Sequence, residues 1–155
     1  MKYILLIFVL LFTSCSIKNY EKTQTKIVII KSPKIKFADI GYLRSTDKAI
    51  ELEMFIAGHA VQKIQVNHLI CVKKGCMSKS GFNEDYLHHS YPDDILQNIL
   101  LGNEIYEGRS KFHSDLGFEQ KILNDDVNIK YRVNDKEIFF KDSKNKIIIK
   151  IKDTK

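Results

Sequence analysis

Residues 118–151 read FEQKILNDDVNIKYRVNDKEIFFKDSKNKIIIKI, and this stretch decides the fold class. Apolar residues alternate with polar ones through four short segments, and brief polar turns such as Asn124-Asp125-Asp126 separate the segments. An alternation with a period of two is typical of strands that bury one face. Turns this short leave no room for a crossover, so we expect each strand to pair with the next in an antiparallel meander.

The same period continues toward the N-terminus. Residues 50–56 and 64–72 alternate in this way, which predicts two further half-buried strands. Residues 35–43 predict an earlier strand with a slip of phase near Ala38 and Asp39, which indicates a bulge. The apolar positions of the two better strands are Ile50, Leu52, Met54 and Ile56, and Ile64, Val66, Ile70 and Val72.

A helix separates the two groups of strands. Residues 91–103 read YPDDILQNILLGN, in which proline and acidic residues begin a helix, Leu96, Ile99 and Leu100 share one face, and Gly102 ends it. Residues 83–87 predict one more helical turn capped by Asn83, and residues 107–116 predict a connection. The expected fold is α+β: one antiparallel sheet, either strongly curved or nearly closed, in a single domain over residues 34–155, with one or two short helices on its concave face.

The N-terminus carries an export signal. A basic start, the apolar run YILLIFVLLF and small residues before Cys15 predict a signal peptide over residues 1–14. The segment resembles the bacterial lipobox, which implies covalent attachment of palmitate-type acyl chains to Cys15 and anchoring to a membrane. An ordinary secreted protein and an uncleaved membrane anchor are the alternatives. Ser16 in place of aspartate favours the periplasmic face of the outer membrane of a Gram-negative bacterium.

Residues 15–33 are expected to form a lipidated tether. Within this segment residues 27–30 read IVII, and Pro33 follows shortly after them. Because proline cannot donate a ladder hydrogen bond, these residues predict either a short edge strand or a segment packed against the domain.

Cys71 and Cys76 flank a turn-like segment that contains Gly75. Export makes a disulfide possible, and cross-strand positions that flank a hairpin loop can approach closely enough to form one, so we predict a Cys71–Cys76 disulfide. A redox or metal-binding pair is the alternative, but redox pairs have two intervening residues rather than four.

The order of strands, helix and strands behind a lipobox resembles the LolA/LolB-type lipoprotein carriers. The likeness runs from Lys34 to Asp153 and includes YPDDILQNILLG (91–102) and the segment GFEQKIL…VNIKY (117–131). It implies an incomplete barrel with helices plugging its concave side, and an outer-membrane lipoprotein that accepts acyl chains of other lipoproteins between sheet and helix. The alternative is a non-enzymatic accessory protein of an envelope assembly, with a filled core.

A curved sheet covered by one short helix leaves apolar space that suits alkyl chains better than water. The same side chains would also form the core of a domain with no cavity. The candidate lining residues are Ile50, Leu52, Met54, Ile56, Ile64, Val66, Leu96, Ile99 and Leu100.

Composition limits the other classes of function. The chain has 155 residues, with 25 Lys+Arg against 19 Asp+Glu, and its basic excess is spread rather than clustered. Export separates it from nucleic acid, so the expected partners are the membrane and other lipoproteins or envelope proteins. The five histidines match no catalytic or metal-binding motif, and a loop gathering His88-His89 with Asp93-Asp94 around a metal is the weaker alternative. We therefore expect no catalytic residues, no metal and no cofactor besides the lipid on Cys15.

Overall fold

The computed structural model describes residues 20–154, which form one 11-stranded antiparallel sheet with two short α-helices. The sheet is open, with β6 (Gly75–Met77) at one edge and β7 (Lys111–Ser114) at the other. The remaining strands are β1 (Lys22–Lys31), β2 (Lys36–Ser45), β3 (Ile50–Ile56), β4 (His59–Val66), β5 (Ile70–Val72), β8 (Gly117–Leu123), β9 (Asn128–Asn134), β10 (Glu137–Asp142) and β11 (Ile147–Asp153). The helices are α2 (Lys79–Tyr86) and α3 (Ile95–Leu101), and a 3-10 turn, η1, covers Tyr106–Gly108.

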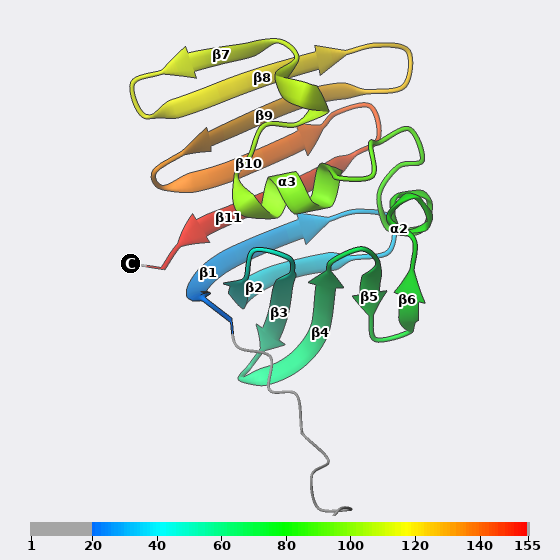
Figure 1. Ribbon diagram of the computed structural model, residues 1–155, viewed down its shortest axis with the longest axis vertical. Helices are drawn as coiled ribbons and strands as arrows, with labels where there is room; N and C mark the ends of the chain where they lie inside the picture. The colour runs from blue at the N-terminus through cyan, green and yellow to red at the C-terminus, as the bar shows by residue number, and fades with distance from the viewer. Residues whose placement is uncertain (1–19, 155) are drawn as a thin grey trace, which may run out of the picture.

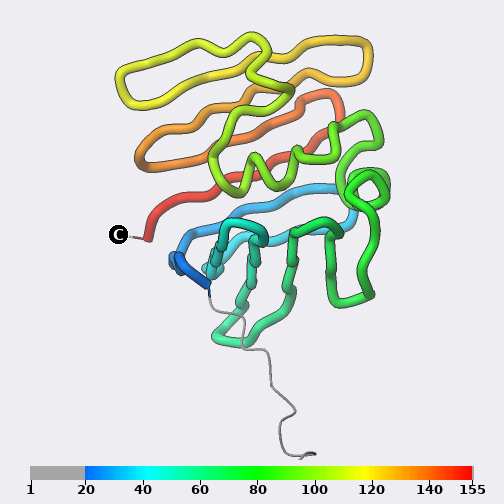
Figure 2. The backbone as a smooth tube through the Cα atoms, in the orientation of Figure 1, coloured from blue at the N-terminus to red at the C-terminus, as the bar shows by residue number. Residues whose placement is uncertain are grey.

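The chain builds the sheet in two halves that meet in its centre. Strands β1 to β6 follow one another toward one edge, the chain crosses through α2 and α3, and β7 to β11 return from the opposite edge (Figure 2). Strand β11 then pairs with β1, for example Val28 with Ile151 and Ile30 with Ile149. The sheet is strongly curved, and α3 lies across its concave face in front of the central strands (Figure 1). The expected α+β class with a curved antiparallel sheet and two short helices is confirmed.

The central position of β1 corrects two expectations. Residues 22–31 are not part of a tether, and they form a ten-residue strand between β2 and β11 rather than an edge strand. Val28 and Ile30 are buried in the core, and the folded domain therefore begins before Lys34. Pro33 lies in the turn that follows β1, where its missing N–H removes no ladder hydrogen bond.

The helix α3 confirms the predicted apolar face and stop, because its buried residues are Ile95, Leu96, Ile99 and Leu100 and it ends at Gly102 in a left-handed conformation. Its predicted start is wrong, since Pro92 and the acidic residues precede the helix, which begins at Ile95. The helix α2 begins earlier than expected, since Ser78 caps it by accepting a hydrogen bond from the Gly81 N–H at 3.0 Å. Asn83 is therefore not a cap. Asn83 lies within α2 and its side chain is buried. The side-chain amide donates to the carbonyl of Pro92 at 2.9 Å, which connects α2 to the segment before α3.

The strand predictions hold for β8 to β11 and for β3, and they fail in three places. Lys111–Ser114 forms an edge strand within the expected connection. The stretch 64–72 breaks into β4 and β5 at a turn in which His68 is exposed. The register of β1 with β2 runs without interruption past Ala38 and Asp39. The irregularity lies instead in the pairing of β3 with β4, where Met54 is opposite Gln62 and Phe55 is opposite Ala60, so that Val61 is skipped.

Candidate binding site at the open end of the sheet

Eight of the nine predicted lining residues lie together in the core between the sheet and α3. Each of the eight is exposed by 3% or less of its surface, so the structure brings them together as expected. Ile56 differs, since it is the last residue of β3, beside the Ala57-Gly58 turn, and is 51% exposed. The eight are Ile50, Leu52, Met54, Ile64, Val66, Leu96, Ile99 and Leu100.

Side chains of the helices fill the space next to this set. Four of the seven residues of α3 point into the core, and Phe82 of α2 joins them with no exposed surface. Two hollows touch the predicted lining only at its margins. One is bordered by Leu100, and the other, of about 240 Å³, by Met54 and Ile56. The region beneath the middle of α3 is therefore packed by the protein's own apolar groups.

The hollow beside Leu100 lies where α3 ends. We call this end of the sheet the open end; strands β1 and β10 begin there, and strands β2, β9 and β11 end there. Its volume is about 220 Å³. Apolar side chains from four strands and from α3 contribute to its lining, which makes one wall of the hollow suitable for hydrocarbon. These are Leu43, Leu100, Leu101, Val133, Ile138 and Ile151.

Gly102 borders the hollow directly after α3, and its backbone has a φ of 71°. A Cβ atom at this position would lie 3.2 Å from Cγ1 of Val133 and 3.3 Å from Cδ1 of Ile138. Glycine therefore does two things here. It adopts the left-handed conformation that ends the helix, and it lets the backbone approach the apolar wall closely.

The rim of the hollow is charged. Three lysines and three acidic residues contribute to the lining, and Lys26 forms an ion pair with Asp153 across β1 and β11. Glu137 pairs with Arg132 at 2.6 Å and with Lys150 at 3.3 Å. The hydrogen bond from Arg132 contributes most to holding the pKa of Glu137 below its usual value, and together with the contact to Lys150 it outweighs burial, which alone would raise the pKa. A wider hollow of about 610 Å³ adjoins the first at Lys136, Glu137 and Asp153. The six charged residues are Lys22, Lys26, Lys136, Asp135, Glu137 and Asp153.

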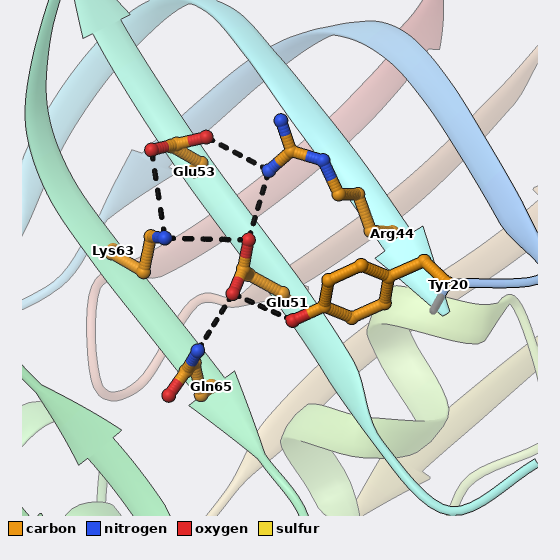
Figure 3. Close-up of polar contacts among 6 residues, drawn as sticks. All are labelled: Tyr20, Arg44, Glu51, Glu53, Lys63 and Gln65. Atoms are coloured by element: carbon orange, nitrogen blue, oxygen red, sulfur yellow. Dashed lines mark hydrogen bonds and ion pairs between the residues drawn. The ribbon is translucent and has the colours of Figure 1, made fainter. Parts of the chain in front are cut away.

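The opposite face of the sheet carries a polar cluster, which we call the Glu51 cluster: Tyr20, Arg44, Glu51, Glu53, Lys63 and Gln65 (Figure 3). Its members meet because of the register, in which Arg44 and Gln65 lie directly opposite Glu51 in the neighbouring strands. One Arg44 nitrogen lies 2.8 Å from carboxylate oxygens of both Glu51 and Glu53. Side chains two residues apart on a strand share a face, so the alternation that buries Leu52 also places Glu51 and Glu53 here.

Glu51 is 4% exposed, although it lies on the face away from the helices. Burial alone would raise its pKa, but hydrogen bonds from Gln65 at 2.6 Å and Tyr20 at 2.7 Å, together with the charge of Lys63, outweigh burial and hold the pKa below its usual value. Burial and the bond to Glu51 in turn raise the pKa of Tyr20 to about 12. The phenol of Tyr20 thus holds the chain just before β1 against β3.

Tyr20 is the residue of this region that the sequence analysis missed, because it was assigned to the tether. The polar alternation of Glu51, Glu53, Lys63 and Gln65 was visible in the sequence. It indicated a polar face without indicating which distant residue would cover it.

Cys71 and Cys76 form the predicted disulfide, and they lie directly opposite each other in β5 and β6 with a Cα–Cα distance of 3.9 Å. Cys15 and the signal segment 1–14 lie outside the described residues. No helix within residues 20–154 has the length and hydrophobicity needed to cross a bilayer.

The histidine-rich segment is held by local contacts. His88 Nδ1 lies 2.8 Å from the hydroxyl of Ser90, and its ring lies 4.3 Å from the ring of His89 between centroids. In the part of the chain that the structure describes, no three His, Cys, Asp or Glu side chains gather in a way that could hold a metal ion.

Comparison of this chain with protein-family models, with curated proteins and with solved structures finds no significant match.

Proposed function

We propose that this chain is a lipid-anchored lipoprotein of the outer membrane, similar to LolA/LolB-type carriers, whose domain binds one acyl chain of a lipid or of another lipoprotein. The observation that carries the proposal is the hollow at the open end of the sheet, where an apolar wall that includes Leu43, Leu100 and Ile151 meets a charged rim. An apolar wall beside charged groups matches the two parts of an amphiphile. In this proposal the protein binds and holds its ligand and performs no chemistry.

The volume limits how much ligand the site can take. At about 30 Å³ for a water-sized group, a hollow of about 220 Å³ holds roughly seven such groups, which corresponds to the end of one acyl chain. Hollows that bind drug-sized ligands usually measure about 300–1,000 Å³, so a whole lipid does not fit inside. The proposal therefore places a chain end beside the C-terminal turn of α3 and leaves the rest of the ligand outside.

Contacts at both ends of α3 support a site beside the helix rather than beneath it. Before the helix, the Tyr91 hydroxyl donates to Asp142 at 2.7 Å, and after it the Tyr131 hydroxyl donates to the carbonyl of Asn103 at 2.8 Å. Burial strongly raises the pKa values of both phenols, so both hydroxyls remain hydrogen-bond donors even at alkaline pH. A helix held in this way keeps the core beneath it closed.

The test uses residues 16–155 without lipid, which retain every described strand, and measures uptake of a fluorescent fatty acid. The variant is Leu101→Glu, because Leu101 borders the hollow and is 42% exposed, so a charge there is tolerated by the fold. The matched control is Leu123→Glu, which places the same charge on an exposed leucine of β8. We expect wild type and the control to bind alike, and Leu101→Glu to bind at least about tenfold more weakly, since the acyl chain would then desolvate a carboxylate.

Membrane attachment is tested separately by labelling cells with radioactive palmitate. The full chain should incorporate label, and Cys15→Ala should not. A Cys15→Ala chain that remains labelled would refute the assigned anchor.

A second candidate function is favoured by the burial of the predicted lining, which is what a domain with a filled core shows. In that case the protein is an accessory subunit of an envelope assembly and takes up no lipid. The uptake assay separates the two, because absence of saturable binding to the folded wild-type domain leaves only the accessory function.

A further inference from the structure

We propose that the open end of the sheet faces the membrane that holds Cys15, and that the ligand is an anionic phospholipid of that membrane, of the phosphatidylglycerol type. This inference rests on the proposed function and adds the direction in which the site opens and the chemistry of the head group. Two independent observations support it: the place where the N-terminal chain is held, and the balance of charges around the hollow.

The chain is held at the open end up to Tyr20. The Tyr20 hydroxyl donates to Glu51 at 2.7 Å, and the Glu21 N–H donates to the carbonyl of Ser45 at 3.1 Å. Lys22 and Ser45 both border the hollow. The hydrogen bonds of residues 20 and 21 therefore hold the chain at the open end of the sheet, on the face that carries the Glu51 cluster. The hollow lies at the same end, on the opposite face.

The distance to the anchor is short. Five residue steps separate Tyr20 from Cys15, and a fully extended chain covers at most about 18 Å in five steps. Strand β1 has ten residues, so the opposite end of the sheet lies about 30 Å from the open end. Because the tether is shorter than the strand, the domain cannot turn its opposite end to the membrane while the open end points away.

The rim charges identify the head group. Asp153 is already paired with Lys26, and Glu137 is surrounded by Arg132, Lys150 and Lys152, so two of the three acidic residues of the rim are neutralised within the protein. Lys22 and Lys136 then stand against Asp135 alone. A phosphate at Lys22 or Lys136 would form charge-assisted hydrogen bonds, and the excess of basic side chains favours a head group with a net negative charge.

The orientation is tested with the full lipidated protein in vesicles of phosphatidylcholine and phosphatidylethanolamine that contain a nitroxide-labelled phospholipid. A fluorophore is attached to Asp135→Cys in the β9–β10 turn at the open end, and in a matched protein to Asp125→Cys in the β8–β9 turn at the other end of β9. Both aspartates are exposed, so both labels leave the core intact. We expect the label at position 135 to be quenched several-fold more than the label at position 125. Equal quenching, or stronger quenching at position 125, overturns the orientation.

The head group is tested with the unlipidated chain by comparing single-chain phosphatidylethanolamine with single-chain phosphatidylglycerol of the same acyl length. We expect at least about threefold tighter binding of the glycerol lipid and weaker binding at higher salt, because basic side chains outnumber acidic ones around the rim. Tighter binding of the ethanolamine lipid overturns the assignment. If both lipids bind equally, or the fluorescent fatty acid binds but the vesicle labels show no preference, the inference fails while the proposed function stands; if nothing binds, the proposed function fails.

Discussion

Replacing Asp142 by asparagine should destabilise the domain more than its small change in shape suggests. Asp142 has no exposed surface and accepts hydrogen bonds through both carboxylate oxygens. One oxygen accepts from the Tyr91 hydroxyl and the Asn145 side chain, each at 2.7 Å, and the other from the backbone N–H groups of Asn128 at 3.1 Å and Lys144 at 3.0 Å. The carboxylate therefore joins the β10–β11 turn to the chain that leads into α3.

Asparagine replaces one acceptor oxygen of the carboxylate by an NH₂ donor. The two groups that donate to that oxygen in the wild type would then face another donor. A hydrogen bond to a charged group contributes about 1.5–3 kcal/mol, and two such bonds are affected, although the Tyr91 hydroxyl can turn and accept. We expect a loss of about 2–4 kcal/mol in the free energy of unfolding. With a urea m-value of about 2 kcal/mol/M, this corresponds to a decrease of about 1–2 M in the midpoint.

The assay is urea unfolding followed by circular dichroism with the disulfide intact, and the control is Asp125→Asn in an exposed turn, expected to change stability by less than about 0.5 kcal/mol. Burial alone would raise the pKa of Asp142, but its hydrogen bonds from Tyr91, Asn145 and Asn128 outweigh burial and lower it. A lowered folded-state pKa contributes stability above the unfolded value near 4 that is lost as the pH falls through the folded value. Wild type should therefore lose stability in acid more steeply than the variant. A midpoint shift no larger than that of the control would refute this reasoning.

Two further predictions concern other parts of the sheet. Reduction of the Cys71–Cys76 disulfide should lower the free energy of unfolding by only about 2 kcal/mol, because the loop that it closes is short. Thermal unfolding with and without reductant measures this loss. An unchanged melting temperature would show that the loop is already ordered without the bond. The pKa of Tyr20 is raised to about 12, so its hydrogen bond to Glu51 should contribute its full stabilisation below pH 10, and this stabilisation should be lost as the pH rises through 12. In a spectroscopic titration of the tyrosines, Tyr20→Phe should remove one phenol from those that ionise at the highest pH. The prediction for Tyr20 is contradicted if Tyr20→Phe removes a phenol that titrates near pH 10.

The parts of the fold that the sequence predicted are those determined by neighbours along the chain. Strands β8 to β11 alternate cleanly and are joined by short turns, and α3 has a visible apolar face and stop. The place of β1 was not predictable in this way, because its partner β11 lies more than 100 residues away and no local pattern records that pairing. Strand β7 was missed because an edge strand buries little, and Phe112 within it is 64% exposed.

The candidate site divides in the same manner. Alternation correctly predicted that Leu52, Met54 and Ile64 face the interior, but a one-dimensional pattern does not state how much volume remains between facing layers. The hollow at the open end instead depends on where α3 stops over the sheet and on the bare backbone of Gly102. The Glu51 cluster depends on a residue that the chain brings back from outside the predicted domain.

The pairing of the first and last strands makes the domain dependent on its own completion. A protein that lacked only β11 would leave β1 and β10 with two long unpaired seams in the middle of the molecule, each bordered by apolar residues such as Val28 and Phe140. Unpaired strand edges of this kind recruit other chains and promote aggregation. Stop codons just before β11 should therefore be as damaging as early ones, and an affinity tag placed directly after β11 needs a spacer that lets this strand insert.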